Sequence, residues 1–176
     1  MSYRDIYLKI ERIMGYSPVE PDDHVSPPIQ YRSTNMKYSR GYHSSAILLP
    51  DGSVIMGGDP NGGSTPNERY LPSYFFKSRP TITAAPPTIA FGAAFSIDTP
   101  TPGAISEVVL MRAGAVTHGF NQNQRYVGCA ITGIGATNVN ATAPPDGNIG
   151  PPGHYLLFLL DRDRVPSVAK WVRLTS

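Results

Sequence analysis

The chain has 176 residues and a formal net charge of +2, with no run of lysine and arginine longer than two residues. This even charge argues against nucleic acid and acidic membrane surfaces as partners, and no segment is apolar for long enough to span a bilayer. Glycine and proline number 17 and 18, while charged residues make up only 16% of the chain. That composition favours many short strands joined by turns over helices.

Residues 1–37 are predicted to form a short amphipathic helix followed by a proline-rich linker. Apolar side chains recur at three and four positions between Tyr3 and Met14, which is the spacing of one helix face. From Ser17 to Asn35 the chain is rich in Pro, Asp and Ser and shows no periodicity. We expect no signal peptide, because Met1 to Asp5 leads into an amphipathic run and not an apolar one.

Residues 38–77 are predicted as one strand-rich segment. Ser44 to Leu49 and Ser53 to Met56 are apolar runs joined by a Pro-Asp-Gly turn, which predicts a hairpin. We interpret Gly57 to Gly63 as a flexible loop and Tyr70 to Phe76 as an aromatic strand. A hairpin of this kind has unpaired edges and apolar faces, so we expect another chain, a second copy or the N-terminal segment to cover it.

Residues 78–176 are predicted to form an immunoglobulin-like β-sandwich, because short strand patterns recur there at regular intervals between turns. The seven expected strands are Thr81–Ala85, Ala93–Asp98, Ile105–Arg112, Arg125–Thr132, Thr137–Thr142, His154–Asp161 and Ser167–Leu174. The single cysteine, Cys129, excludes an intrachain disulfide and is interpreted as a small buried hydrophobe. One Asn-X-Thr sequon occurs, at Asn140. The predicted fold class is therefore all-β.

Tyr42 and His43 stand together at the start of the first apolar strand run. A phenol and an imidazole are a suitable ligand pair for a tetragonal metal such as Cu(II), and His118 is the candidate for a second imidazole. Neighbouring strand residues point to opposite faces, so Tyr42 and His43 can share a metal only at a strand end, a loop or a bulge. The copper hypothesis also requires His118 to lie close to them.

Four segments carry a family resemblance that covers most of the chain after residue 37. They are Arg40 to Gly52; Leu71 to Phe75 with Arg79-Pro80; Val116 to Phe120 with Gln124-Arg125; and Pro151 to Phe158 with Val165 to Ala169. In this order and spacing they resemble the C-terminal region of the galactose oxidase and glyoxal oxidase family of copper-radical oxidases. The resemblance implies a last propeller-blade segment followed by an early-set immunoglobulin-like sandwich, whose long hairpin carries His118.

The resemblance also implies roles for three residues. His43 and His118 would be the two equatorial imidazoles on copper, and Tyr42 the axial phenolate that accepts the proton of the substrate hydroxyl. The implied reaction oxidises a small alcohol, aldehyde or sugar with O2 to give H2O2, and the implied location is extracellular. The family's redox cofactor is a second tyrosine cross-linked to a cysteine on earlier propeller blades, and this chain does not supply it.

The expected partners are accordingly the missing propeller portion or other protein chains, including a second copy of this one. Two other functions stay open. The chain could be a non-catalytic structural or interaction module that assembles with other chains. It could also be a carbohydrate-binding module, which would need exposed aromatic side chains on one sheet face, with candidates at Tyr70, Tyr74, Phe75 and Phe76.

Overall fold

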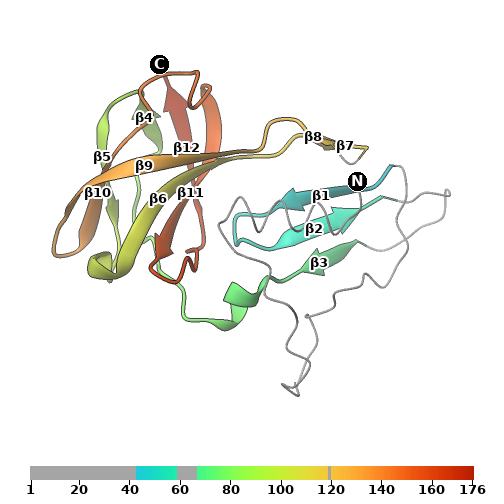
Figure 1. Cartoon of the computed structure of the whole chain (residues 1–176), viewed down its shortest axis with the longest axis horizontal. Helices are drawn as coiled ribbons and strands as arrows, with labels where there is room; N and C mark the ends of the chain where they lie inside the picture. The colour runs from blue at the N-terminus through green and yellow to red at the C-terminus, as the bar shows by residue number, and fades with distance from the viewer. Residues whose placement is uncertain (1–42, 59–66, 119) are drawn as a thin grey trace.

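A computed structural model of the chain describes residues 43–58, 67–118 and 120–176. All regular elements in these ranges are β-strands and two short 3₁₀ helices, so the all-β prediction is confirmed (Figure 1). The strands form a three-stranded sheet, a seven-stranded sheet and a two-stranded hairpin. The predicted N-terminal helix and linker lie outside the described residues, as does Tyr42. No helix within the described ranges has the length and hydrophobicity of a membrane span.

The three-stranded sheet contains β1 (Ser45–Leu48), β2 (Val54–Gly57) and β3 (Glu68–Tyr70), all antiparallel. The turn between β1 and β2 works as the Pro-Asp-Gly sequence predicts. Gly52 has φ +85°, which glycine adopts without strain, and its N–H donates to the carbonyl of Leu49 at 2.8 Å. The Asp51 carboxylate accepts from the backbone N–H of Ser53 at 2.9 Å. The predicted hairpin is therefore confirmed.

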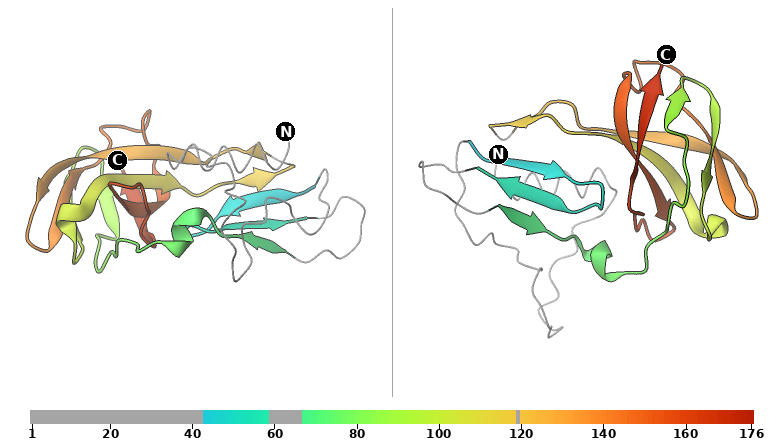
Figure 2. Two further views of the ribbon diagram at one scale, coloured as in Figure 1. Left: turned by 60° about the horizontal axis from the view of Figure 1, so that its bottom comes forward. Right: turned by 180° about the vertical axis from the view of Figure 1, so that it is seen from behind.

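The seven-stranded sheet follows the three-stranded sheet in the chain. Its strands are β4 (Thr88–Ala90), β5 (Ala94–Asp98), β6 (Ile105–Arg112), β9 (Arg125–Ile134), β10 (Asn138–Thr142), β11 (Gly153–Asp161) and β12 (Lys170–Thr175). They are hydrogen-bonded in the order β4-β12-β11-β6-β9-β10-β5, and every pair is antiparallel except β12 with β4. The sheet curls until its two halves face each other across a core, as a sandwich close to a barrel (Figures 1 and 2).

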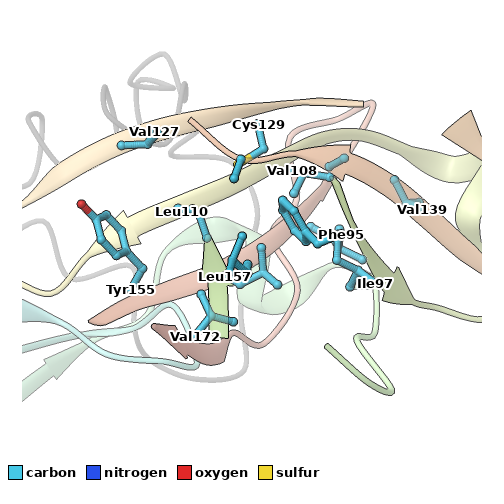
Figure 3. Packing of buried hydrophobic residues seen from close by; sticks show 14 of the residues in the cluster. Phe95, Ile97, Val108, Leu110, Val127, Cys129, Val139, Tyr155, Leu157 and Val172 are labelled. Carbon is cyan, nitrogen blue, oxygen red and sulfur yellow. The ribbon is translucent and has the colours of Figure 1, made fainter. Parts of the chain in front are cut away.

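The core inside this curled sheet, which we call the inner cluster, is built by alternate residues of its strands. From β11 it takes Tyr155, Leu157 and Leu159, all fully buried. Figure 3 shows several members converging from β5, β6, β9, β10, β11 and β12. Cys129 is among them and is 7% exposed, which confirms its interpretation as a small buried hydrophobe.

The outer face of the same sheet carries a second hydrophobic cluster, which we call the outer cluster. Leu156, Phe158 and Leu160 come from β11, because successive strand residues point to opposite faces. Its remaining buried members are Val109 and Met111 of β6, Ala169, and Ala46, Leu48, Val54 and Met56 of the three-stranded sheet. The chain's own sandwich therefore covers one face of the hairpin, a cover that the sequence prediction had assigned to other segments or chains.

Two predicted strands are wrong. Thr81 to Ala85 forms only an isolated bridge, between Ala84 and Asp98, and the ladder to β12 is made instead by Thr88–Ala90. Prolines 86 and 87 end the first segment, since they have no N–H for a ladder. Of the aromatic strand predicted from Tyr70 to Phe76, only Tyr70 lies in a strand, as the last residue of β3. After Pro72 the chain forms a 3₁₀ helix, Ser73–Phe76.

Arg79 joins this 3₁₀ helix to the sandwich. Its Nε donates to the carbonyl of Pro166 at 2.7 Å and its Nη2 to the carbonyl of Ser167 at 2.8 Å. The guanidinium also lies over the rings of Tyr74 and Phe75, 5.5 Å and 4.8 Å from their centroids. A planar fork can meet two carbonyls and stack on a ring together, which an ammonium cannot.

We therefore expect Arg79→Lys to lower the free energy of unfolding by about 1–2 kcal/mol, because it loses one charged hydrogen bond and the stacking. Denaturant unfolding measures the change. Arg162→Lys, at an exposed position, is the matched control and should be near neutral. Equal effects of the two substitutions would contradict the role given to Arg79.

Candidate metal site

His43 lies just before β1, at the end of the three-stranded sheet that approaches the two-stranded hairpin (Figures 1 and 2). Its side chain is exposed, and the strand ladder begins two residues later, at Ser45. Gly58, with φ +94°, packs directly against its backbone. A Cβ on Gly58 would lie 2.7 Å from Cα of Ser44 and closer still to the carbonyl oxygen of His43. Only glycine fits this backbone contact.

His118 occupies the turn between β7 (Val116–Thr117) and β8 (Phe120–Asn121). These strands extend the β6–β9 pair away from the sandwich and bring the turn beside β1 (Figure 1). His118 has φ +50°, in the left-handed region that few non-glycine residues adopt. Backbone strain of this kind persists where the surrounding structure holds it, often at functional sites.

The two imidazoles meet in space although they are far apart in the sequence. Their ring centroids are 4.5 Å apart and the ring planes are inclined by 58°. A metal–nitrogen bond of about 2.0 Å places a ring centroid about 3.1 Å from the ion, so two imidazoles at adjacent coordination positions have centroids roughly 4.4 Å apart. The observed separation therefore fits two adjacent ligands of one ion.

The ring of His118 is held by its neighbour Thr117. Its Nδ1 is hydrogen-bonded to Oγ1 of Thr117 at 2.6 Å. A histidine whose Nδ1–H donates to an oxygen binds metal through Nε2, and such a bond fixes both the tautomer and the orientation of the ring. With Nδ1 engaged by Thr117, Nε2 is the ring nitrogen of His118 that would bind a metal.

A third ligand has to come from elsewhere. Within residues 43–58, 67–118 and 120–176, no group of three or more His, Cys, Asp or Glu side chains could hold a metal ion. Tyr42, the predicted phenol ligand, precedes His43 directly but lies outside the described residues. The described part of the site is therefore a pair of histidines, which suits imidazole-binding metals such as copper or zinc.

Cys129 does not belong to this site. It lies on β9 inside the inner cluster, and burial raises the pKa of its thiol from 9.0 to about 12. A thiol of such high pKa in an apolar core is a poor nucleophile. It therefore does not provide the cysteine of a Tyr–Cys cofactor at His43 and His118.

Two results are expected from this pKa. The native thiol should not react with a disulfide reagent at pH 8, and it should react fully after denaturation. The Cys129 contribution to stability should be complete below about pH 9 and should fall as pH rises toward 12, because only the unfolded thiol ionises in that window. Cys129→Ala removes this component, so unfolding of the two proteins between pH 8 and 11 isolates it. Rapid labelling of the folded protein would contradict the burial.

Sequence reasoning found the two histidines but not the residues that position them. Thr117 was part of a recognised segment, but its bond to His118 depends on side-chain rotamers in the turn. Gly58 was interpreted as part of a flexible loop. The pair Gly57-Gly58 at the end of an apolar run was the available signal, since glycine at a strand end often marks a close backbone approach.

Comparison with known proteins supports a relationship for most of the chain. The family described as "Galactose oxidase-like, Early set domain" matches residues 79–174. "Aldehyde oxidase GLOX" of Vitis pseudoreticulata is 37% identical over 163 residues, covering 77% of this chain and 30% of that protein. A galactose oxidase of Gibberella zeae is 32% identical over 158 residues, covering 83% of this chain and 23% of that protein.

A solved structure agrees with these sequence matches. It is described as a "novel fungal alcohol oxidase with catalytic diversity among the AA5 family, in complex with copper". It superimposes with a TM-score of 0.73 at 26% identity, covering 81% of this chain and 33% of the oxidase. The chain therefore spans about a third or less of the length of these relatives.

Proposed function

Because the chain belongs to the galactose oxidase-like early-set domain family, whose model matches residues 79–174, we propose that it is the C-terminal portion of a copper-radical oxidase. In this proposal it contributes His43, His118 and Tyr42 to a copper site. The remaining two thirds of such an oxidase would supply a propeller and the Tyr–Cys cofactor. The reaction would convert an alcohol or aldehyde with O2 to the oxidised product and H2O2.

The observation that carries the proposal is the meeting of His43 and His118 at 4.5 Å between ring centroids. The two histidines are held by different sheets: His43 lies just before β1, and His118 lies in the turn of the hairpin that extends β6 and β9. A purely structural domain does not require two exposed imidazoles at this separation. The strained backbone of His118 and the close contact of Gly58 with His43 both favour a position selected for binding.

The chain's own residues would divide the work at this site. His43 and His118 would bind the metal, Thr117 would hold the His118 ring, and Tyr42 would accept the proton of the substrate hydroxyl. Bound copper would supply one-electron chemistry and an open position for the substrate oxygen. Both histidines are exposed in this chain, so the excluded-water environment of an oxidase would have to come from the missing propeller portion.

Copper titration by calorimetry tests the proposal on the full chain. We expect one Cu(II) per chain, with His43→Ala and His118→Ala each weakening binding at least about 100-fold, beyond the 10–100-fold typical of residues that only support a ligand. His154→Ala is the matched control, because His154 is an exposed histidine on β11 that pairs with Arg173. Its binding should equal that of the wild type.

The alternative is a non-catalytic interaction module that assembles with other chains. The outcome that favours it is clear: no stoichiometric copper binding by the folded wild-type chain, or equal loss in all three histidine variants. Binding that depends on His43 and His118 would instead support the copper proposal, and the search would turn to the chain that carries the radical cofactor.

A further inference from the structure

The sequon Asn140-Ala141-Thr142 lies on β10, in the middle of the half of the sandwich formed by β5, β10 and β9. Its two flanking apolar residues, Val139 and Ala141, are fully buried in the inner cluster. Since alternate strand residues share a face, Asn140 and Thr142 both point to the outer face. Both are partly exposed. The residue pair that defines the sequon is thus presented together on the surface.

The side-chain amide of Asn140 is oriented by its neighbour on the same face. Asn138 Nδ2 donates to Oδ1 of Asn140 at 3.0 Å and also to Oγ of Ser96 at 2.8 Å. The oxygen of the Asn140 amide is therefore engaged. Its Nδ2, the atom that a glycan modifies, has no hydrogen-bond partner in the part of the chain that the structure describes.

The residues paired with Asn140 have small side chains or none. Asn140 pairs with Gly133 on β9 and with Ser96 on β5. The Asn140 amide lies over Gly133, where even a Cβ would meet its Nδ2 at 3.6 Å, an ordinary van der Waals distance. Thr142, whose hydroxyl completes the sequon, pairs with Ala130 and Ala94. The flanking strands leave room for a bulky substituent.

From these observations we infer that Asn140 is an N-glycosylation site, used when the chain passes through the secretory pathway. In this reaction a bond forms between Nδ2 and the anomeric carbon of a lipid-pyrophosphate-linked oligosaccharide, and the bond from that carbon to the pyrophosphate oxygen breaks. The amide loses one proton, and the lipid pyrophosphate leaves with the electron pair. The inference does not depend on copper binding.

A glycan at Asn140 would also identify a face that stays in solvent. The three-stranded sheet packs on the outer face of β6 and β11, whereas β10 and β5 lie on the far side of the sandwich from it (Figures 1 and 2). A propeller portion or another partner would then have to dock near the three-stranded sheet and not on the β5–β10–β9 face.

The test uses the full chain fused to a cleavable secretion leader and a C-terminal Asn-Gly-Thr tag, expressed in a eukaryotic secretory host. The sequence has one sequon of its own, so the tag provides a second, internal control for glycosylation. Intact mass is measured before and after treatment with peptide N-glycosidase. Both the secreted protein and the protein retained in the secretory compartments of the host cell are measured. Mass spectrometry of the peptides then locates the aspartate that the enzyme leaves at a modified asparagine.

We expect two glycans on the wild type and one on Asn140→Gln and Thr142→Ala. Thr142→Ser keeps the hydroxyl and should keep two glycans, which separates loss of the sequon from a general effect of substitution on β10. A wild-type chain modified only on its tag would overturn the inference. Two glycans on Asn140→Gln would also overturn it.

Discussion

Phe158→Ala is expected to lower the free energy of unfolding by about 3–5 kcal/mol, the usual cost of removing a fully buried phenylalanine. Phe158 is 0% exposed and lies in the outer cluster, where the sandwich meets the three-stranded sheet. The substitution should therefore leave a cavity between the two sheets. Thermal or denaturant unfolding measures the loss of stability.

The same variant should weaken copper binding even where it is fully folded, because the outer cluster holds the sheet that carries His43 against the sandwich that carries His118. Trp171→Ala is the matched control. Trp171 is also a large aromatic residue, on the neighbouring strand β12 and paired with Leu156, but it is 52% exposed. We expect the control to cost under about 1 kcal/mol. Similar losses in the two variants would contradict the assignment of Phe158 to the interface.

Gly58→Ala should have the second largest effect, and it should act mainly on the site. An alanine at φ +94° is strained by about 1–3 kcal/mol. Its Cβ would also collide with the backbone of His43 and Ser44, which cannot yield as a flexible side chain can. The backbone of His43 must then shift, which changes the position of its ring relative to that of His118. We expect stability to fall and copper affinity to drop at least about tenfold.

Gly128→Ala provides the control for this experiment. Gly128 lies on β9, has no positive φ, and a Cβ there would have nothing within 4 Å. Its stability and copper affinity should stay close to those of the wild type. If Gly58→Ala bound copper as the wild type does, the close contact at His43 would have no role in positioning the ligand.

The sequence predicted well those elements whose signal is local. The hairpin of β1 and β2 follows from two apolar runs and a Pro-Asp-Gly turn, and β6, β10 and β11 follow from apolar or alternating runs between turns. The strand expected at Thr81 to Ala85 failed for a non-local reason. Thr-Ile-Thr has high strand propensity, yet the segment pairs only through the bridge of Ala84 with Asp98, and Pro86 and Pro87 prevent the pairing from continuing.

The site was predictable in its residues but not in its geometry. His43 and His118 were identified by the segments around them, whereas their separation depends on the packing of two sheets. The apolar run from Tyr155 to Leu160 did carry a usable signal. An uninterrupted apolar strand indicates burial on both faces, which would have pointed to the three-stranded sheet as the second layer.

Because β11 is buried on both faces, the sandwich and the three-stranded sheet depend on each other for stability. Without β1 and β2, the side chains of Leu156, Phe158 and Leu160 would be exposed to solvent. An exposed apolar surface of this kind promotes aggregation. A sandwich made without the segment from His43 to Gly57 would therefore need another cover for these side chains. The same segment begins with His43, so the contacts that cover the sandwich also bring the imidazole of His43 to that of His118.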